Sequence, residues 1–245
     1  NAFFNFPKIL LLTMQGGYLA GNQVGLEMAP AETFDGFYEQ YKMQVEHFIN
    51  EYAETANLAC QFFNEKYKRP LVSSVISGCI DKAQLADEGG AYFWHKCMNS
   101  SGLGTAIDSL VAIYDVVYDK KLKTMDEFVK ILDNDFYGEE AFRLYLVNKL
   151  PKYGNGDPMV DGLAKDFVDF YCAAVSKCKT WNGTPYRPGL YSYYGPSVNY
   201  GIKTGSTPDG RIQGEPLSLN TDPGHGCIRS GLTGAMKSVT VYDQA

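Results

Sequence analysis

Apolar residues recur along most of the chain with the three- and four-residue spacing of amphipathic helices. The longest such pattern runs from about Thr33 to Tyr67, and a proline at position 70 ends it. Shorter patterns with recognisable start or stop signals predict helices at about residues 5–15, 105–118 and 139–149, one beginning at the capping box of Thr124, and one following Asp157 and Pro158.

The pattern changes after Thr180. The segment "TPYRPGLYSYYGPSVNYG" (184–201) is aromatic and interrupted by prolines, which predicts extended chain, and a glycine-rich loop follows at 205–226. The closing "AMKSVTVY" (235–242) alternates as a strand does, whereas "LVSSVISGCI" (71–80) is too short for its period to separate strand from helix. Helices followed by extended segments, without repeats or linkers, predict one α/β region over residues 1–245.

Composition supports an ordinary globular chain. Of its 245 residues, 45% are hydrophobic and 14% aromatic, which is enough for a packed core. The net charge of -6, without a basic cluster, argues against nucleic acid as a partner. The longest apolar run, Ile9 to Met14, is far shorter than the roughly 18 residues of a membrane span. We therefore predict a cytoplasmic protein that does not bind nucleic acid or membranes.

Common catalytic and binding motifs are absent. The sequence has no GxGxxG, GxxxxGK[ST], GxSxG or HExxH motif, and its six cysteines form no CxxC pair, so we predict no metal site. Among the histidines, we predict His47 at the surface and His95 buried and hydrogen-bonded, while the loop residue His225 is equally consistent with a structural or a functional role. Asp108 lies in an apolar helix, where we expect its carboxylate to cap a neighbouring backbone group.

The glycine-rich loop contains a charged turn. Asp209 and Arg211 flank Gly210, so the carboxylate can close the turn while the guanidinium ties the loop to a carboxylate or carbonyl elsewhere. We interpret Asp209, Gly210, Arg211 and His225 as structural loop residues.

Five segments, taken together, resemble one family. They are "PLVSSVISGCIDKAQLADEGGAYF" (70–93), "GLGTAIDSLVAIYDVVYDKKLKTMDEF" (102–128), "PKYGNGDPMVD" (151–161), "PYRPGLYSY" (185–193), and "GSTPDGRIQGEPLS" with "SGLTGAMKSV" (within 205–239). In this order and spacing they resemble the glycyl radical enzymes of the pyruvate formate-lyase superfamily.

The resemblance implies part of a ten-stranded α/β barrel. It also implies a backbone glycyl radical that passes its spin to a cysteine, whose thiyl radical abstracts hydrogen from substrate. In the family a separate radical-SAM activating enzyme installs the radical, and the full-length enzyme is expected to be a homodimer. Such enzymes cleave C–C or carbon–heteroatom bonds.

Two family motifs have no match here. The thiyl cysteine belongs to a GCxE-type loop and the radical glycine to an RVSGY-like motif, and neither occurs in this sequence. Cys79 resembles a structural position of the family, and Cys227 carries no inferred catalytic role. We therefore expect no catalytic residue in this chain, which is inactive alone and requires the remainder of the enzyme or a complementary chain.

The resemblance also implies that the segment at 185–194 lines the substrate cavity. Tyr186 resembles an active-site aromatic of the dehydratase-like members, and Tyr191, Ser192 and Tyr194 are further pocket candidates, although each tyrosine is equally consistent with packing in the barrel. We expect dehydratase- or decarboxylase-like lyase activity on a small organic substrate. Formate C-acetyltransferase activity is one alternative, and a non-catalytic structural or interaction subunit is another.

Overall fold

The computed structural model describes residues 2–191 and 193–243. A three-stranded parallel sheet lies at its centre, in the order β1 (Ala2–Asn5), β4 (Cys97–Ser101) and β5 (Arg187–Gly189). In the pairing register Phe3 lies opposite Asn99, which in turn lies opposite Gly189. A small antiparallel hairpin, β2 (Tyr18–Leu19) and β3 (Asn22–Gln23), follows the first helix.

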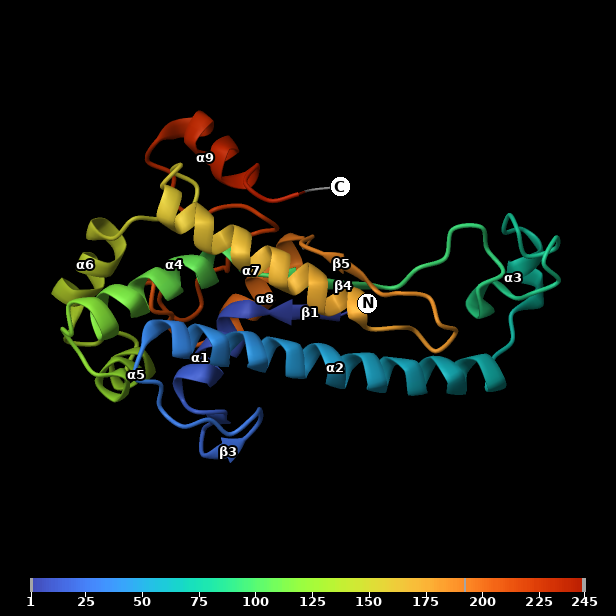
Figure 1. Ribbon diagram of the computed structural model, residues 1–245, viewed down its shortest axis with the longest axis horizontal. Coiled ribbons are helices and arrows are strands. Elements are labelled where there is room, and N and C mark those ends of the chain that lie inside the picture. Colours follow the sequence, from blue (N-terminus) through green and yellow to red (C-terminus); the bar gives the residue numbers. More distant parts are fainter. Residues whose placement is uncertain (1, 192, 244–245) are drawn as a thin grey trace.

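One face of the sheet is covered by α2 (Phe34–Lys66) and α7 (Pro158–Lys177) (Figure 1). From this face Phe4 makes edge-to-face ring contacts with Tyr52 of α2 and Tyr171 of α7. The Tyr171 hydroxyl also donates to the Met98 carbonyl of β4 at 2.6 Å. Because side chains alternate along a strand, Phe4 and Met98 belong to the core face, whereas Phe3 and Asn99 belong to the opposite face.

The predicted long helix is confirmed as α2. Thr33 caps its start by accepting a hydrogen bond from the Gly36 N–H at 3.2 Å, and fully buried Tyr41, Val45 and Ile49 mark its core stripe. The far end of α2 extends beyond the sheet and leads into a projecting lobe at residues 67–95, which contains the short helix α3 (Pro70–Ser74) and the turn η1 (Ala86–Glu88) (Figure 1).

The other predicted helices are also present, with the bounds α1 Phe6–Met14, α4 Leu103–Ile113, α5 Met125–Asp133 and α6 Glu140–Lys149. The helix at 105–118 differs in one respect, because α4 continues as a π-helical segment, η2 (Tyr114–Asp119). The capping box is confirmed by reciprocal hydrogen bonds between Thr124 and Glu127, and Asp157 caps α7 by accepting from two backbone N–H groups.

Two predictions of extended structure were wrong. The second half of 184–201 forms α8 (Tyr194–Lys203), since Pro196 lies in the first helical turn, where a missing N–H breaks no helical hydrogen bond. The predicted closing strand is the helix α9 (Gly231–Val239), whose buried small residues Gly234, Ala235 and Ser238 have helical spacing. In the ambiguous segment 71–80, residues 71–74 belong to α3 and residues 75–80 form turns.

No helix among the described residues is long and apolar enough to cross a membrane.

Candidate functional site

The segment at 204–218 crosses the carboxyl ends of β1 and β4. The Asn5 side-chain amide, at the end of β1, donates to the Thr204 hydroxyl at 2.8 Å. Just after β4, the Gly102 N–H donates to the Ser218 carbonyl at 3.2 Å. Because ligands of open parallel α/β sheets bind outside the carboxyl ends of the strands, this segment lies where a functional site is expected.

Reciprocal hydrogen bonds fasten the loop to the start of α4. The Thr105 N–H donates to the Ser218 hydroxyl and the Ser218 N–H donates to the Thr105 hydroxyl, both at 3.1 Å. Further along, a Cβ added at Gly104 would lie 2.6 Å from the Asp222 carbonyl oxygen. The backbone of the loop therefore approaches α4 too closely for any side chain at Gly104.

Arg211 holds the loop in shape from inside. Arg211 is only 7% exposed, and its guanidinium donates to four carbonyls of the same loop region: those of Thr204, Gly205, Ile212 and Glu215. Its Nε also donates to the Thr207 hydroxyl at 3.1 Å. These partners answer the question left open by the sequence, because Arg211 binds nearby carbonyls rather than a carboxylate.

Asp209 closes the turn around Gly210, and two cations anchor that turn to the rest of the protein. The Asp209 carboxylate accepts from the Thr207 hydroxyl at 2.5 Å and from the Arg211 N–H at 3.4 Å. Lys152, itself only 3% exposed, donates to the Asp209 carbonyl at 2.9 Å, and Arg143 of α6 donates to the Gly210 carbonyl at 3.3 Å. These groups line a cavity of about 310 Å³ together with His225 and Cys227.

Asp108 lies beneath this turn and is fully buried. Its Oδ1 accepts a hydrogen bond from the Tyr153 N–H at 2.7 Å, as expected for a backbone cap, and its carboxyl group also interacts with the Cys227 thiol. Burial raises the pKa of Asp108 to about 7, although the nearby Lys152 charge favours ionisation. Burial and the Asp108 charge also raise the pKa of the Cys227 thiol to about 12.

This environment predicts that Asp108→Asn stabilises the protein at alkaline pH. The folded carboxyl binds a proton more tightly than the unfolded one, so its unfavourable contribution is complete above pH 7 and fades as pH falls toward 3.8. We expect the variant to gain about 2 to 4 kcal/mol at pH 8 and almost nothing at pH 4. Urea unfolding at several pH values measures this, and a gain that does not vary with pH contradicts it.

The face of the sheet opposite the helical core carries polar and aromatic side chains. By alternation and register, Phe3, Cys97, Asn99 and Arg187 share this face with Gly189. Ser101 belongs to the same face at the carboxyl end of β4, and its buried hydroxyl has no hydrogen-bond partner. An unpartnered buried hydroxyl is uncommon in folded proteins, so this position is a candidate for ligand contact.

The structure separates the predicted pocket residues. Tyr186 is 1% exposed in the hydrophobic core, and its hydroxyl donates to the Asn57 side chain at 3.0 Å. Tyr191 and Tyr194 are exposed after β5, while Ser192 lies outside the described residues. Next to them, the Tyr193 ring contacts the Phe3 ring edge-on. Tyr193 thus lies against the polar face of the sheet, whereas Tyr186 packs with the helices.

The position of Tyr186 predicts a structural effect of Tyr186→Phe. Loss of the hydroxyl leaves the Asn57 oxygen without this donor, so we expect a loss of about 1 kcal/mol in the free energy of unfolding. Tyr191→Phe, at an exposed hydroxyl, serves as the matched control and should leave stability unchanged. Equal stabilities of the two variants in denaturant titrations would contradict a structural hydrogen bond at Tyr186.

None of the three histidines is buried in the structure. His95 is exposed, so the prediction that it is buried was wrong, because the chain between the lobe and β4 runs along the surface there. His47 is half-buried beside the Phe48 ring, and His225 is exposed at the edge of the loop cavity.

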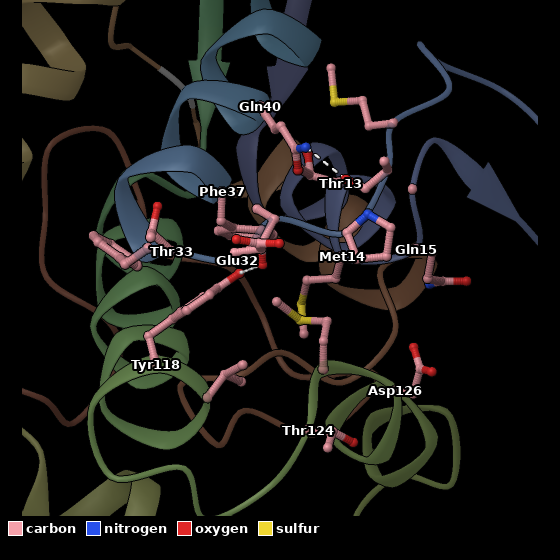
Figure 2. Close-up of a pocket in the computed structure, with 18 of the residues that line it drawn as sticks. Thr13, Met14, Gln15, Glu32, Thr33, Phe37, Gln40, Tyr118, Thr124 and Asp126 are labelled. Carbon is pink, nitrogen blue, oxygen red and sulfur yellow. Dashed lines mark hydrogen bonds between the residues drawn. The ribbon is translucent and has the colours of Figure 1, made fainter.

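A larger cavity, of about 1010 Å³, lies away from the loop. Figure 2 shows its walls: the end of α1 with Thr13 and Gln15, the start of α2, the π-helical segment with Tyr118, and the start of α5. Gln40 donates to the Ala29 carbonyl at 2.7 Å, and Tyr118 donates to the Ala31 carbonyl at 3.3 Å. These hydrogen bonds hold the wall at 29–31 in place, and none of the predicted site residues that the structure describes lines this cavity.

Within residues 2–191 and 193–243, no group of three or more histidine, cysteine, aspartate or glutamate side chains is placed to hold a metal ion. Sequence reasoning missed Lys152, Asn99 and Ser101. Lys152 carries no sequence signal of burial. "CMNSS" has no alternation that would identify a strand, so the polar face of β4 was not predicted.

Solved structures define the class of protein to which this fold belongs. The chain superimposes with a TM-score of 0.90 on the glycerol-bound B12-independent glycerol dehydratase from Clostridium butyricum, at 34% identity over 98% of this chain and 31% of that one. It also matches a glycyl radical enzyme from Archaeoglobus fulgidus, with a TM-score of 0.87 and 27% identity over 96% of this chain and 30% of the other. The predicted mixed α/β barrel section is confirmed by these matches.

The chain belongs to the pyruvate formate lyase-like family, whose model matches residues 1–200. Among curated relatives, the trans-4-hydroxy-L-proline dehydratase of Clostridioides difficile is 31% identical over 249 residues, covering 98% of this chain. The chain spans 31% of the length of that relative. The resemblance inferred from the five segments is therefore confirmed.

Proposed function

We propose that this chain forms part of the substrate chamber of a glycyl radical lyase that eliminates water from a small hydroxylated substrate. The similarity in fold and in sequence to dehydratases, over nearly the whole chain, carries the proposal. Both glycerol and trans-4-hydroxy-L-proline, named for those relatives, carry a hydroxyl on a saturated carbon. We therefore propose that the substrate of this protein also carries a hydroxyl on a saturated carbon.

The radical comes, in this proposal, from a glycine and a cysteine in parts of the polypeptide that these 245 residues do not include. A radical-SAM activating enzyme installs it, and the complete protein is a cytoplasmic homodimer. When present, the radical supplies hydrogen abstraction from substrate. The residues of this chain bind and orient the substrate and exclude water from the chamber.

The polar face of the sheet supports a binding role. Asn99 and Ser101 offer an amide and a hydroxyl near the carboxyl end of β4, and both can exchange hydrogen bonds with substrate hydroxyls. Phe3 supplies an apolar wall beside them, and the exposed Tyr191 and Tyr194 are proposed to close the chamber from the end of β5. The loop that contains Asp209, Gly210, Arg211 and His225 is proposed to hold these strand ends in place.

The unpartnered hydroxyl gives a selective test. Ser101→Ala removes a group without a protein partner, so the free energy of unfolding should not fall. If the hydroxyl contacts substrate, kcat/KM should fall about 10-fold or more. Ser100→Ala is the matched control, since Ser100 lies on the other face and its hydroxyl donates to the Gly189 carbonyl at 3.4 Å. An unchanged kcat/KM in Ser101→Ala would place this hydroxyl outside the chamber.

The reaction itself is tested with the full polypeptide that contains this chain, activated under anaerobic conditions. Glycerol and trans-4-hydroxy-L-proline are supplied separately, and the products are identified by mass spectrometry. Loss of water from either substrate is the expected result. Formate production from pyruvate and coenzyme A would instead favour formate C-acetyltransferase, and failure to activate under conditions that activate a control relative would favour a non-catalytic subunit.

A further inference from the structure

Cys60 and Lys96 meet at the base of the projecting lobe. The Lys96 Nζ donates a hydrogen bond to the Cys60 Sγ at a separation of only 2.6 Å. Cys60 lies on the far part of α2, and Lys96 immediately precedes β4. Cys60 therefore lies shortly before the lobe at 67–95, and Lys96 lies directly after it (Figure 1).

A small oxidant can reach this pair. Both side chains are half-buried, and they line a cavity of about 380 Å³ whose walls include Phe63, Trp94 and Trp181. A cysteine sulfur that is accessible to peroxide is oxidised first to a sulfenic acid, which condenses with a nearby nitrogen or thiol. A nitrogen within 3.5 Å of the sulfur, already held there, is in the range of reacting atoms before bond formation.

We propose that Cys60 and Lys96 form a covalent sulfenamide crosslink when the protein meets a peroxide. In the first step Sγ attacks hydrogen peroxide, an S–O bond forms as the O–O bond breaks, and the thiol becomes a sulfenic acid with release of water. The Lys96 ammonium first releases a proton to water, and its amine then attacks Sγ, so that the S–N bond forms as the S–O bond breaks. The hydroxide leaves with one amine proton as a second water molecule.

In the two steps together, one thiol, one amine and one hydrogen peroxide molecule react to form one sulfenamide and two water molecules. Sulfur is oxidised and peroxide is reduced, and no other electron donor or acceptor is needed. The linked side chains together weigh two hydrogen atoms less than the separate ones. A dithiol reductant reverses the link by attacking the sulfur and releasing the amine.

The remaining cysteines are less suited to this chemistry. Four of them react less readily, because Cys79 is buried and burial raises the pKa of Cys172, Cys178 and Cys227, which lowers the thiolate fraction that reacts with peroxide. The fifth, Cys97, is half-buried in β4, so what distinguishes it from Cys60 is whether an amine is held at its sulfur. Among the hydrogen bonds of residues 2–191 and 193–243, no other lysine amine donates to a cysteine sulfur. The crosslink is thus expected at one pair only.

The consequence is local and mechanical. A bond from residue 60 to residue 96 closes the intervening segment, with its lobe, into a covalent loop. This loop restricts separation of the end of α2 from the strand β4 that follows it. Oxidation would therefore fix the base of the lobe while leaving the strands themselves unmodified.

The test uses the full polypeptide that contains this chain, purified under reducing anaerobic conditions and then exposed to hydrogen peroxide. Tryptic peptides are analysed by mass spectrometry. We expect the Cys60 and Lys96 peptides to be joined, with a combined mass lower by two hydrogen atoms, no cleavage after Lys96, and release by dithiothreitol. Lys96→Arg keeps a cation beside the sulfur but lacks a nucleophilic amine, so the joined peptide should be lost completely.

Lys152→Arg is the matched control, because Lys152 lies near Cys227 and is not in this pair. It should leave the joined peptide unchanged. Cys60 oxidised to a sulfinic acid in the unsubstituted protein, with normal cleavage after Lys96, would overturn the proposal. So would a joined peptide that carries an additional oxygen atom, since that mass denotes an oxygen bridge rather than a direct S–N bond.

Discussion

Replacing Arg211 with methionine is expected to destabilise the protein by about 3 to 5 kcal/mol, because four carbonyls of the loop lose their donor in a buried place. Methionine fills a similar volume, so the loss reports the missing hydrogen bonds more than a cavity. Urea unfolding of the variant beside the unsubstituted protein measures the difference.

Two controls make the result specific to the forked guanidinium. Arg211→Lys keeps the positive charge but cannot bind the carbonyls on both sides at once, so we expect it to recover only part of the loss. Lys165→Ala removes an exposed cation that pairs with Asp169 along α7, and no measurable change is expected. Full stability of Arg211→Met would contradict the role assigned to this loop.

A second large effect is expected for Gly154→Ala. Gly154 has a φ of +91°, and an added Cβ would lie 2.0 Å from the Pro223 Cγ, so the variant suffers both backbone strain and a collision with the loop. We expect a loss of about 3 kcal/mol or more in the free energy of unfolding, with the contact between the loop and this segment disrupted. Hydrogen exchange near residue 224 should rise in the same variant.

Gly183→Ala isolates the part of that effect that comes from backbone strain. Gly183 has a similar φ of +86°, but an added Cβ there meets no atom within 4 Å. A loss of about 1 to 2 kcal/mol is therefore expected. If Gly154→Ala lowers the free energy of unfolding no more than Gly183→Ala does, the close approach of Pro223 adds nothing to the cost of the substitution.

The sequence predicted the helices well where one long periodic pattern decided them, as in α2 and α7. It failed where tertiary contacts decide. β1 and β4 are short parallel strands that pair across a long stretch of chain, and the polar residues of β4 give no alternation of their own. α8 was missed because Pro196 was interpreted as a mark of extended chain, although it occupies a first-turn position.

The site was predicted in a similar, partial way. The charged turn at Asp209 and Arg211 was recognisable because its glycine and charges are adjacent in sequence. Its anchors, Lys152 and Arg143, come from other segments, and only the folded chain brings them to the loop. The burial of Tyr186 and the unpartnered Ser101 hydroxyl likewise depend on packing, which a single sequence does not record.

The central claim is that this chain is part of a glycyl radical enzyme. Electron paramagnetic resonance of the full polypeptide tests it most directly, after anaerobic incubation with a radical-SAM activating enzyme, S-adenosylmethionine and reductant. The trans-4-hydroxy-L-proline dehydratase, activated in parallel with its own activating enzyme, shows that the conditions work. We predict a glycyl radical doublet that oxygen abolishes, and a featureless spectrum beside an activated control would contradict the account.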